Sequence, residues 1–187
     1  MIHPAWLLVS GMCFGVSGWQ LFVWLRETHD KNNKYQTAKS YAHKRGKPLL
    51  IAGGPWGSRP VRRWLRIPAH GDGHVCLDID RNAIGEHPNG VVATVTHIPF
   101  GNKSFGAVFV SHLLEHLASV DDAKKALAEF NRVAEAVYIA YPFRQSISGW
   151  ITPGHHLWVW QKDNTIYLKP KGKSRNKEDY HYLNTSD

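Results

Sequence analysis

The fold is decided by residues 91–117, which read VVATVTHIPFGNKSFGAVFVSHLLEHL. Two nearly continuous apolar runs, Val91–Val95 and Ala107–Ser111, lie on either side of a turn-rich segment. Such runs are typical of strands that are buried on both faces of a sheet. Similar runs occur at Leu49–Gly53, His74–Asp80 and Ala136–Tyr141. Five such strands, separated by loops or helix-compatible segments, predict an α/β fold with a mostly parallel sheet and flanking helices.

The clearest helix follows residue 117. Ser119 can cap its N-terminus, and Asp122 lies three residues further on, where an acidic side chain favours the positive end of the helix dipole. One face of this helix is apolar at helical spacing, with Ala123, Ala126, Leu127, Phe130 and Ala134. We expect this face to pack on the sheet.

The C-terminal part of the chain predicts a β-hairpin. The segments HLWVWQ (156–161) and TIYLKP (165–170) are separated by the turn residues KDN. We expect this hairpin to close one edge of the sheet. Residues 171–187 lack periodicity and are rich in charge, which predicts a mobile basic tail.

The N-terminal segment from Ala5 to Leu25 is uncharged and has the length that a helix needs to cross a bilayer. Trp24 suits the membrane interface, and Arg26 begins a basic stretch of the kind found on the cytoplasmic side. Residues 1–27 are therefore predicted to be a single-pass transmembrane anchor, with the soluble domain in the cytoplasm. A cleaved signal peptide is the alternative, but no basic region precedes the apolar run. Gly11 and Gly15 form a G-x-x-x-G that could join two such helices in a homodimer.

Between the anchor and the first strand, residues 28–47 are polar and predict a linker with a cover helix toward Pro48. Residues 48–170 then form a single globular domain, because a chain of 187 residues has room for one core. Cys13 and Cys76 lie in apolar runs without a metal-ligand pattern. Neither a disulfide framework nor a zinc site is predicted from them.

The formal net charge of +8 and the pI near 9.6 suit nucleic acid, anionic lipid or an acidic substrate. Much of this charge lies in the two flanking segments rather than in one patch. No base-reading motif accompanies it, so a nucleic-acid partner is not predicted.

Two loops of the predicted sheet carry residues suited to a nucleotide-like ligand. Gly53, Gly54 and Gly57 follow the first strand, where a ligand can approach the backbone closely. Asp78 ends the second strand, and a carboxylate at this place in an α/β nucleotide-binding fold can accept hydrogen bonds from ribose hydroxyls. Asp80, two residues on, is its rival for this role.

Residues 49–142 resemble the type 11 branch of the class I S-adenosylmethionine-dependent methyltransferases, whose fold is Rossmann-like. The resemblance lies in a Leu-Pro-Phe-like turn, a Ser-Phe-Asp-like turn, a hydrophobic strand, a Leu-Glu-His-Leu-like segment and an E-x-x-R-V helix. In this chain these elements are Ile98-Pro99-Phe100, Ser104-Phe105-Gly106, Val108–Ser111, Leu114-Glu115-His116-Leu117, and Glu129 with Arg132-Val133.

The resemblance implies a cofactor, S-adenosylmethionine, and a set of residues that bind it. Gly53, Gly54 and Gly57 would lie under its methionine part, and Asp78 would hold its ribose. Ile79 would flank the adenine, Thr94 and Val95 would lie near the edge of the adenine, and Ser111 would face the sulfonium. The implied function is a membrane-anchored methyltransferase that acts on an unidentified acceptor.

Three positions depart from the family pattern. Leu50-Ile51-Ala52 lacks the acidic residue that usually precedes the glycines, Thr94 stands where an acidic residue commonly meets the adenine, and Gly106 replaces the aspartate of Ser-Phe-Asp. The alternative function is therefore a non-catalytic, membrane-anchored binding or scaffolding module that keeps the fold but has lost cofactor binding.

Methyl transfer from a sulfonium depends mainly on alignment, so no invariant base is required and the catalytic residues remain unknown. The residues that could serve as bases are His112, His116, His155 and His156. The pair His112 and His116 also has metal-ligand spacing, but no third ligand is evident and H-E-x-x-H is absent, so no metal is predicted. The aromatic residues Trp150, Trp158, Trp160 and Tyr167 could line a substrate pocket, although core packing is the simpler interpretation.

Overall fold

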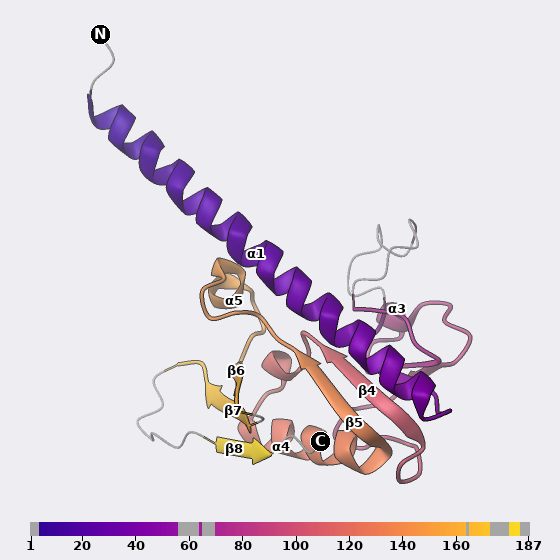
Figure 1. Cartoon of the computed structure of the whole chain (residues 1–187). Coiled ribbons are helices and arrows are strands. Elements are labelled where there is room, and N and C mark those ends of the chain that lie inside the picture. Colours follow the sequence, from indigo (N-terminus) through magenta and orange to yellow (C-terminus); the bar gives the residue numbers. More distant parts are fainter. Residues whose placement is uncertain (1–3, 56–63, 65–69, 164, 173–179, 184–187) are drawn as a thin grey trace.

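A computed structural model describes residues 4–55, 64, 70–163, 165–172 and 180–183. A five-stranded sheet, in the order β3-β2-β1-β4-β5, forms its centre, and all neighbouring strands are parallel. Figure 1 shows two of its strands, β4 and β5, side by side. These strands are β1 (Leu49–Ala52), β2 (Val75–Asp78), β3 (Gly90–Val92), β4 (Phe105–Ser111) and β5 (Ala134–Ala140). Each overlaps one of the five predicted apolar runs, and the Rossmann-like α/β fold is confirmed. For the run 91–95, however, only Val91 and Val92 are in a strand, and this edge strand is partly exposed instead of buried on both faces. The middle strands β1 and β4 are buried along their whole length, as continuous apolar sequence requires.

One face of the sheet is covered by the long helix α1 (Pro4–Lys44), which crosses the sheet diagonally and then extends beyond it toward the N-terminus (Figure 1). Ala38 and Ala42 on α1 are fully buried against Phe109 and other residues of the sheet, and the ring of Tyr35 lies 5.5 Å from that of Phe109. The C-terminal part of α1 is therefore a cover helix.

The polar segment 28–47, in which a linker was expected, is helical up to Lys44 and continuous with the apolar segment before it. No Gly or Pro interrupts the sequence between Gly18 and Gly46, so nothing in this stretch breaks a helix. An ion pair between Lys34 and Asp30, at 2.8 Å and one helical turn apart, adds local support.

Gly106 marks the place where α1 comes closest to β4. A Cβ atom on Gly106 would lie 2.8 Å from the Cα of Ala42 and 3.1 Å from the Cβ of Lys47. The aspartate of the family's Ser-Phe-Asp turn has no room here. This departure from the family pattern is therefore explained by the packing of α1, not by the ligand site.

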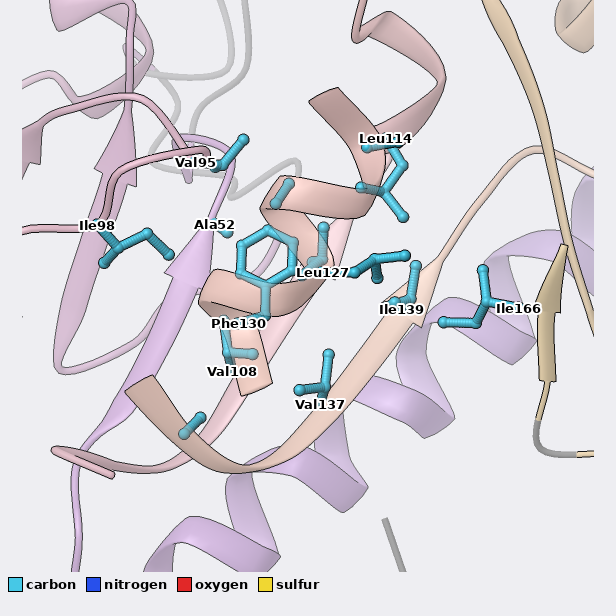
Figure 2. Packing of buried hydrophobic residues seen from close by; sticks show 14 of the residues in the cluster. Ala52, Val95, Ile98, Val108, Leu114, Leu127, Phe130, Val137, Ile139 and Ile166 are labelled. Atoms are coloured by element: carbon cyan, nitrogen blue, oxygen red, sulfur yellow. The ribbon is translucent and has the colours of Figure 1, made fainter. Parts of the chain in front are cut away.

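The other face of the sheet packs against α4 (Val120–Val133), whose residues Leu127 and Phe130 lie against Val108, Val137 and Ile139 (Figure 2). The predicted cap is present: the Ser119 side chain accepts a hydrogen bond from the backbone N–H of Asp122 at 3.1 Å. The expected apolar face is buried at Ala123, Ala126, Leu127 and Phe130, whereas Ala134 lies beyond the helix and begins β5. Two short helices, α3 (Arg81–Ile84) and the 3₁₀ helix η1 (Leu114–His116), follow the ends of β2 and β4.

The predicted hairpin is present as β6 (Leu157–Lys162) and β7 (Thr165–Pro170), but the expectation that it closes the edge of the sheet is wrong. It forms a separate antiparallel sheet, in the order β6-β7-β8, with β8 (Tyr180–Leu183). Its apolar residues alternate, so that one face is buried in the α4 core, and Ile166 shows this in Figure 2. Alternation of apolar and polar residues is typical of a sheet with one buried face. A strand that extended the central sheet would be covered on both faces and would be apolar throughout.

The predicted mobile tail, residues 171–187, is partly a strand, because β8 pairs with β7 between Thr165 and Leu168. Its other residues beyond Gly172 lie outside the described part of the chain. The sequence of β8, Tyr-His-Tyr-Leu, has the aromatic content of a strand. Its four residues lie next to a charged segment, so the sequence does not mark them as a strand.

Large apolar side chains are exposed along the N-terminal part of α1, beyond the sheet. They are Met12, Phe14, Val16, Trp19, Leu21, Phe22, Trp24 and Leu25. Among the described residues, no helix contains a segment that is both long enough and apolar enough to cross a bilayer. The short helix α5 (Ile147–Ile151) lies beside this part of α1 and also exposes Trp150 and Ile151 (Figure 1).

Candidate functional site

The strand order reverses between β1 and β4, and the edge formed by the carboxyl ends of these two strands is called the crevice below. The chain moves from β1 outward to β2 and β3, then returns to β4 on the other side of β1 and continues to β5. Ligands of open α/β sheets bind where the direction of strand order reverses, outside the carboxyl ends of the strands. The loops that follow β1, β2 and β4 therefore define the candidate site.

The glycines after β1 allow three segments to meet closely at this edge. Gly53 has a φ of +94°, and a Cβ there would lie 3.5 Å from the carbonyl oxygen of Ser111 at the end of β4. A Cβ on Gly54 would lie 2.2 Å from the carbonyl oxygen of Ala83 in α3, where no side chain fits. The loop thus needs glycine for its own packing, and the third predicted residue, Gly57, lies outside the described residues.

Asp78 lies at the centre of the candidate site. Its Oδ2 accepts a hydrogen bond from the backbone N–H of Gly54 at 2.6 Å, and its Oδ1 accepts one from the N–H of Asp80 at 2.8 Å. These bonds fix the carboxylate between the ends of β1 and β2. A carboxylate has about four lone-pair positions, so two acceptor positions remain for the two hydroxyls of a ribose.

Asp80, the rival for the ribose, has a different task. Its Oδ1 accepts a hydrogen bond from the backbone N–H of Asn82 at 2.8 Å, which makes Asp80 the N-cap of α3. A capping carboxylate is held in place by the helix that it begins. The structure therefore separates the two acids that the sequence left as competitors.

The three residues expected around the adenine lie in different environments. Ile79 follows Asp78 directly and is 75% exposed, so its apolar side chain is open to a flat ring. The hydroxyl of Thr94 lies 3.0 Å from that of Thr96 and is half-buried. The side chain of Val95 is buried in the hydrophobic core between the sheet and α4, so only its backbone can face a ligand.

Polar groups from separate parts of the chain gather at the end of β4. Ser111 is buried, and its Oγ lies 3.2 Å from the Nδ1 of His70. His112 follows with a φ of +50°, a backbone conformation that is uncommon for a residue other than Gly. Its Nε2 lies 3.8 Å from a carboxylate oxygen of Glu27 on α1, and its Nδ1 lies 3.5 Å from Oε1 of Glu115. His112 is thereby held between two carboxylates beside the crevice.

Glu27 was missed because nothing in its sequence neighbourhood signals a role. It lies in the segment assigned to the anchor, yet its side chain also accepts a hydrogen bond from the backbone N–H of Phe143 at 3.1 Å. Glu27 thus connects α1 with the segment after β5 and with His112 after β4. Only the position of α1 across the sheet brings these residues together.

The motifs that carry the family resemblance beyond the crevice form a structural network. The Glu129 carboxylate accepts hydrogen bonds from Arg132 and from the backbone N–H of Ile98, at 2.7 Å each. Arg132 also donates to the carbonyl oxygens of Ile98 and Phe100, at 2.9 and 2.8 Å. The hydrogen bond from Arg132 lowers the pKa of Glu129 to about 2. The E-x-x-R pair therefore holds the Ile-Pro-Phe turn against α4.

A pocket of about 320 Å³ lies between α1 and the segment after β5. Trp19, Phe22 and Tyr141 give it an aromatic lining, and Arg26 and Arg144 supply positive charge. The guanidinium of Arg144 lies 4.8 Å from the ring centre of Trp160, which is also part of the lining. Tyr141 and Phe143 adjoin the end of β5, on the same side of the molecule as Glu27 and His112.

Of the four aromatic residues considered for a substrate pocket, Trp160 alone is among the lining residues of this pocket. The rings of Trp160 and Tyr167 stack at 5.3 Å across the β6–β7 pair. Trp150 and Trp158 contact each other edge to face at 4.6 Å. Trp150, Trp158 and Tyr167 therefore stabilise mainly the hairpin and its junction with α5.

The histidines proposed as bases divide into two groups. His112 lies at the crevice, whereas His116 and His155 contact each other further along, with ring centres 4.6 Å apart. Burial is the main cause that lowers the pKa of His155. His156 is exposed, and its backbone N–H donates to the carbonyl oxygen of Glu115 at 2.7 Å. His112 is the histidine whose position suits proton transfer at the crevice.

Comparison with known proteins agrees with this geometry. A family model described as a methyltransferase domain matches residues 57–136. No curated protein matches the chain.

Three solved structures show low similarity. A protein of Pyrococcus horikoshii is 13% identical, with a TM-score of 0.41 and coverage of 81% of this chain and 74% of that one. The 1,6-didemethyltoxoflavin-N1-methyltransferase of Burkholderia thailandensis, with bound 1,6-didemethyltoxoflavin and S-adenosylhomocysteine, is 13% identical, with a TM-score of 0.40 and coverage of 99% and 75%. An S-adenosylmethionine-dependent methyltransferase of Clostridium acetobutylicum is 9% identical, with a TM-score of 0.35 and coverage of 72% and 63%.

TM-scores this low carry no argument of their own, so the assignment depends on the sequence motifs and on the family model. Both fall on the part of the chain that contains β2 to β4 and α4. Residues 57–136 match a methyltransferase domain, and the motifs within them resemble those of the class I, S-adenosylmethionine-dependent enzymes.

Proposed function

We propose that this chain is an S-adenosylmethionine-dependent methyltransferase that is tethered to a membrane by α1 and methylates an acceptor reached at the membrane surface. The observation that carries the proposal is the position of Asp78. Its carboxylate is held by the N–H groups of Gly54 and Asp80 at the crevice, and it keeps two acceptor positions. This is the arrangement that a ribose needs at the end of a second strand.

The residues around Asp78 fit the remaining parts of S-adenosylmethionine. The exposed side chain of Ile79 offers an apolar surface for the adenine. Gly53 and Ser111 bring the ends of β1 and β4 together, where the sulfonium would lie. When bound, the cofactor supplies an activated methyl group, and these residues position it.

Methyl transfer requires that the acceptor atom, the methyl carbon and the sulfur be held in line. Bound at the crevice, the cofactor would supply a sulfonium-activated methyl group, and Gly53, Asp78 and Ser111 would hold it in place for the acceptor. If the acceptor carries a proton, His112 is placed to take it, because its ring lies beside the crevice with carboxylate oxygens of Glu27 and Glu115 at 3.8 and 3.5 Å from its two nitrogens.

The membrane part of the proposal is supported by the surface of α1. The uncharged run from Ala5 to Leu25 contacts the domain at its C-terminal end, where Val23 is buried, and its other large apolar side chains from Met12 to Leu25 are exposed. Exposed apolar patches of this kind mark contact with a membrane or another protein. The aromatic pocket beside Trp19 and Arg26 would then lie near the bilayer surface, within reach of an amphipathic acceptor with a negative group.

The test uses full-length protein in its host membranes, incubated with S-adenosylmethionine that carries a radiolabelled methyl group. We expect label in a membrane component, dependent on the protein and lost with Asp78→Ala. No transfer of label, together with no binding of the cofactor, would favour the scaffolding module instead. The missing acid before the glycines and Thr94 in place of an acid are the observations that favour this second function.

A further inference from the structure

Glu115 is a buried carboxylate whose contact with His112 leaves both of its oxygens without a hydrogen bond among the described residues. Its side chain is 2% exposed. Within the described part of the chain, neither of its two oxygens has a hydrogen-bond partner. A buried carboxylate without a partner is strongly unfavourable, so such a group normally pairs with a cation or binds a metal.

Two imidazoles lie next to this carboxylate. His116 is its neighbour in η1, and His155 comes from the loop before β6. One ligand atom from each of Glu115, His116 and His155 lies within 4.8 Å of the others. For three atoms at these separations, a central point lies within about 2.8 Å of each atom. Bonds from zinc to nitrogen or oxygen are only slightly shorter, at about 2.0–2.2 Å. Side-chain shifts of less than about 1 Å would therefore complete the site.

Both imidazoles are oriented by backbone carbonyl groups. The Nδ1 of His116 lies 3.1 Å from the carbonyl oxygen of Gly154, and the Nδ1 of His155 lies 3.4 Å from that of Gly149. An N–H at Nδ1 that donates to a carbonyl leaves Nε2 as the coordinating nitrogen. Metal-binding histidines almost always carry such a second hydrogen bond, which fixes the tautomer and the ring orientation.

We propose that Glu115, His116 and His155 form a zinc site that joins η1 to the loop before β6. Two histidines and one glutamate are a ligand set that zinc uses in three-ligand sites, where a water or a substrate atom completes the tetrahedron. His116 is exposed, so the metal can enter from solvent.

Two other groups could balance the charge of Glu115 instead. The Nδ1 of His112 lies 3.5 Å from Oε1, which is too long for a hydrogen bond. The ammonium of Lys171 donates to the carbonyl oxygen of Gly149 and lies 4.4 Å from the ring centre of Trp158. Neither group gives the carboxylate a hydrogen bond, whereas a metal would bind it directly.

A second cluster of ligand types, Asp72, Cys76 and His87, carries no such proposal. The Nε2 of His87 already contacts Asp72 and the carbonyl oxygen of Gly73, at 3.2 and 3.1 Å. Burial raises the pKa of the Cys76 thiol to about 12, so this sulfur is a neutral core group. No buried carboxylate there lacks a partner within the described residues.

Zinc in this position would connect the two sheets. The backbone N–H of His156 already donates to the carbonyl oxygen of Glu115 at 2.7 Å, which places the hairpin against η1. A metal bond across the same junction stabilises the folded state by mass action, because the ligands are separated in the unfolded chain. The thermal midpoint should therefore rise with zinc concentration.

The experiment uses the full-length protein in detergent, freed of metal with a chelator and then titrated with Zn²⁺ in competition with a chromophoric chelator. We expect one equivalent to bind, and Co²⁺ in its place to give the strong visible absorption of a four-coordinate ion. Glu115→Gln and His155→Ala should each weaken zinc binding at least about tenfold. His156→Ala is the matched control, since this neighbour lies outside the cluster, and it should bind zinc as the parent does.

Glu115→Gln keeps the shape of the side chain and removes the buried charge, so it should fold and should no longer gain thermal stability from zinc. Absence of an equivalent of bound zinc in the parent overturns the proposal. So does zinc binding that survives both Glu115→Gln and His155→Ala, because it would come from other histidines. Metal binding is measured without S-adenosylmethionine, so this outcome is independent of the methyltransferase assignment.

Discussion

At the scale of single residues, the family motifs have roles that their sequence positions do not reveal. Glu129 and Arg132 lie far along the chain from Ile98, yet their side chains hold the turn that follows β3. Glu115 and His116 are neighbours in the Leu-Glu-His-Leu-like segment, but the first is buried and the second is exposed. Neighbouring residues of one motif can therefore have different environments and different roles.

The clamp predicts a specific loss of stability in acid. Arg132 lowers the pKa of Glu129 to about 2, below its ordinary value of 4.5. A lowered pKa stabilises the folded state fully above about pH 4.5, and this contribution is lost as the pH falls toward about 2. Glu129→Gln should cost about 1–2 kcal/mol at pH 7, since the pair is partly exposed to solvent.

Thermal unfolding of the parent and of Glu129→Gln between pH 7 and pH 2 checks this prediction. The difference between the two proteins should be constant near neutrality and should shrink below pH 4.5. Glu86→Gln is the control, because Glu86 is exposed. A difference that stays constant down to pH 2 would mean that the ionised carboxylate contributes nothing.

At the scale of elements, the strands and α4 could be predicted because their signals are local. Ser119 and the apolar face of α4 stand together in the sequence, and both are observed. The polar composition of residues 28–47 predicts a linker with a cover helix. The structure instead has one helix, α1, that continues to Lys44, because no Gly or Pro interrupts this stretch before Gly46. The place of the hairpin could not be predicted, because alternation specifies one buried face but not the surface that covers it.

The close contact between α1 and β4 predicts that Gly106→Ala destabilises the protein. The added methyl group would lie 2.8 Å from the Cα of Ala42, so α1 must move away from the sheet. Overpacking of this kind costs about 1–3 kcal/mol. Gly101→Ala is the matched control in the preceding exposed turn, where a Cβ meets only the Ser104 hydroxyl at 3.4 Å.

Denaturant unfolding measures the loss, and hydrogen exchange locates it. We expect faster exchange in Gly106→Ala for the amides of the last turns of α1, around Ala38 and Ala42. Equal stability of the two glycine variants would show that α1 does not depend on this contact.

At the scale of the whole molecule, α1 is the element that connects the core, the polar group beside the crevice and the aromatic pocket. It covers the sheet with Ala38 and Ala42, supplies Glu27 to the polar group beside the crevice, and lines the aromatic pocket with Trp19 and Phe22. Gly53, Asp78 and Ser111 could be placed at the site from sequence, since strand ends converge in a parallel sheet. Glu27 and His155 could not, because their proximity to His112 and Glu115 depends on how distant segments pack.

The anchor predicts how the full-length protein fractionates. The uncharged run from Ala5 to Leu25, together with the exposed apolar side chains of α1, should keep the protein in the membrane pellet after an alkaline carbonate wash. A chain that starts at Trp19 keeps the contacts of Gln20 and should be extracted, since its remaining apolar run is too short to span a bilayer. Quantitative extraction of the full-length protein would rule out a spanning helix.

The central claim, that the crevice binds S-adenosylmethionine through Asp78, is tested most directly by calorimetric titration of three full-length proteins in detergent. The account predicts one bound cofactor for the parent, affinity reduced at least about tenfold for Asp78→Ala, and near-parental affinity for Asp80→Ala, whose carboxylate caps α3 instead. Binding to Asp78→Ala as tight as to the parent, or no binding to the parent at all, would contradict it.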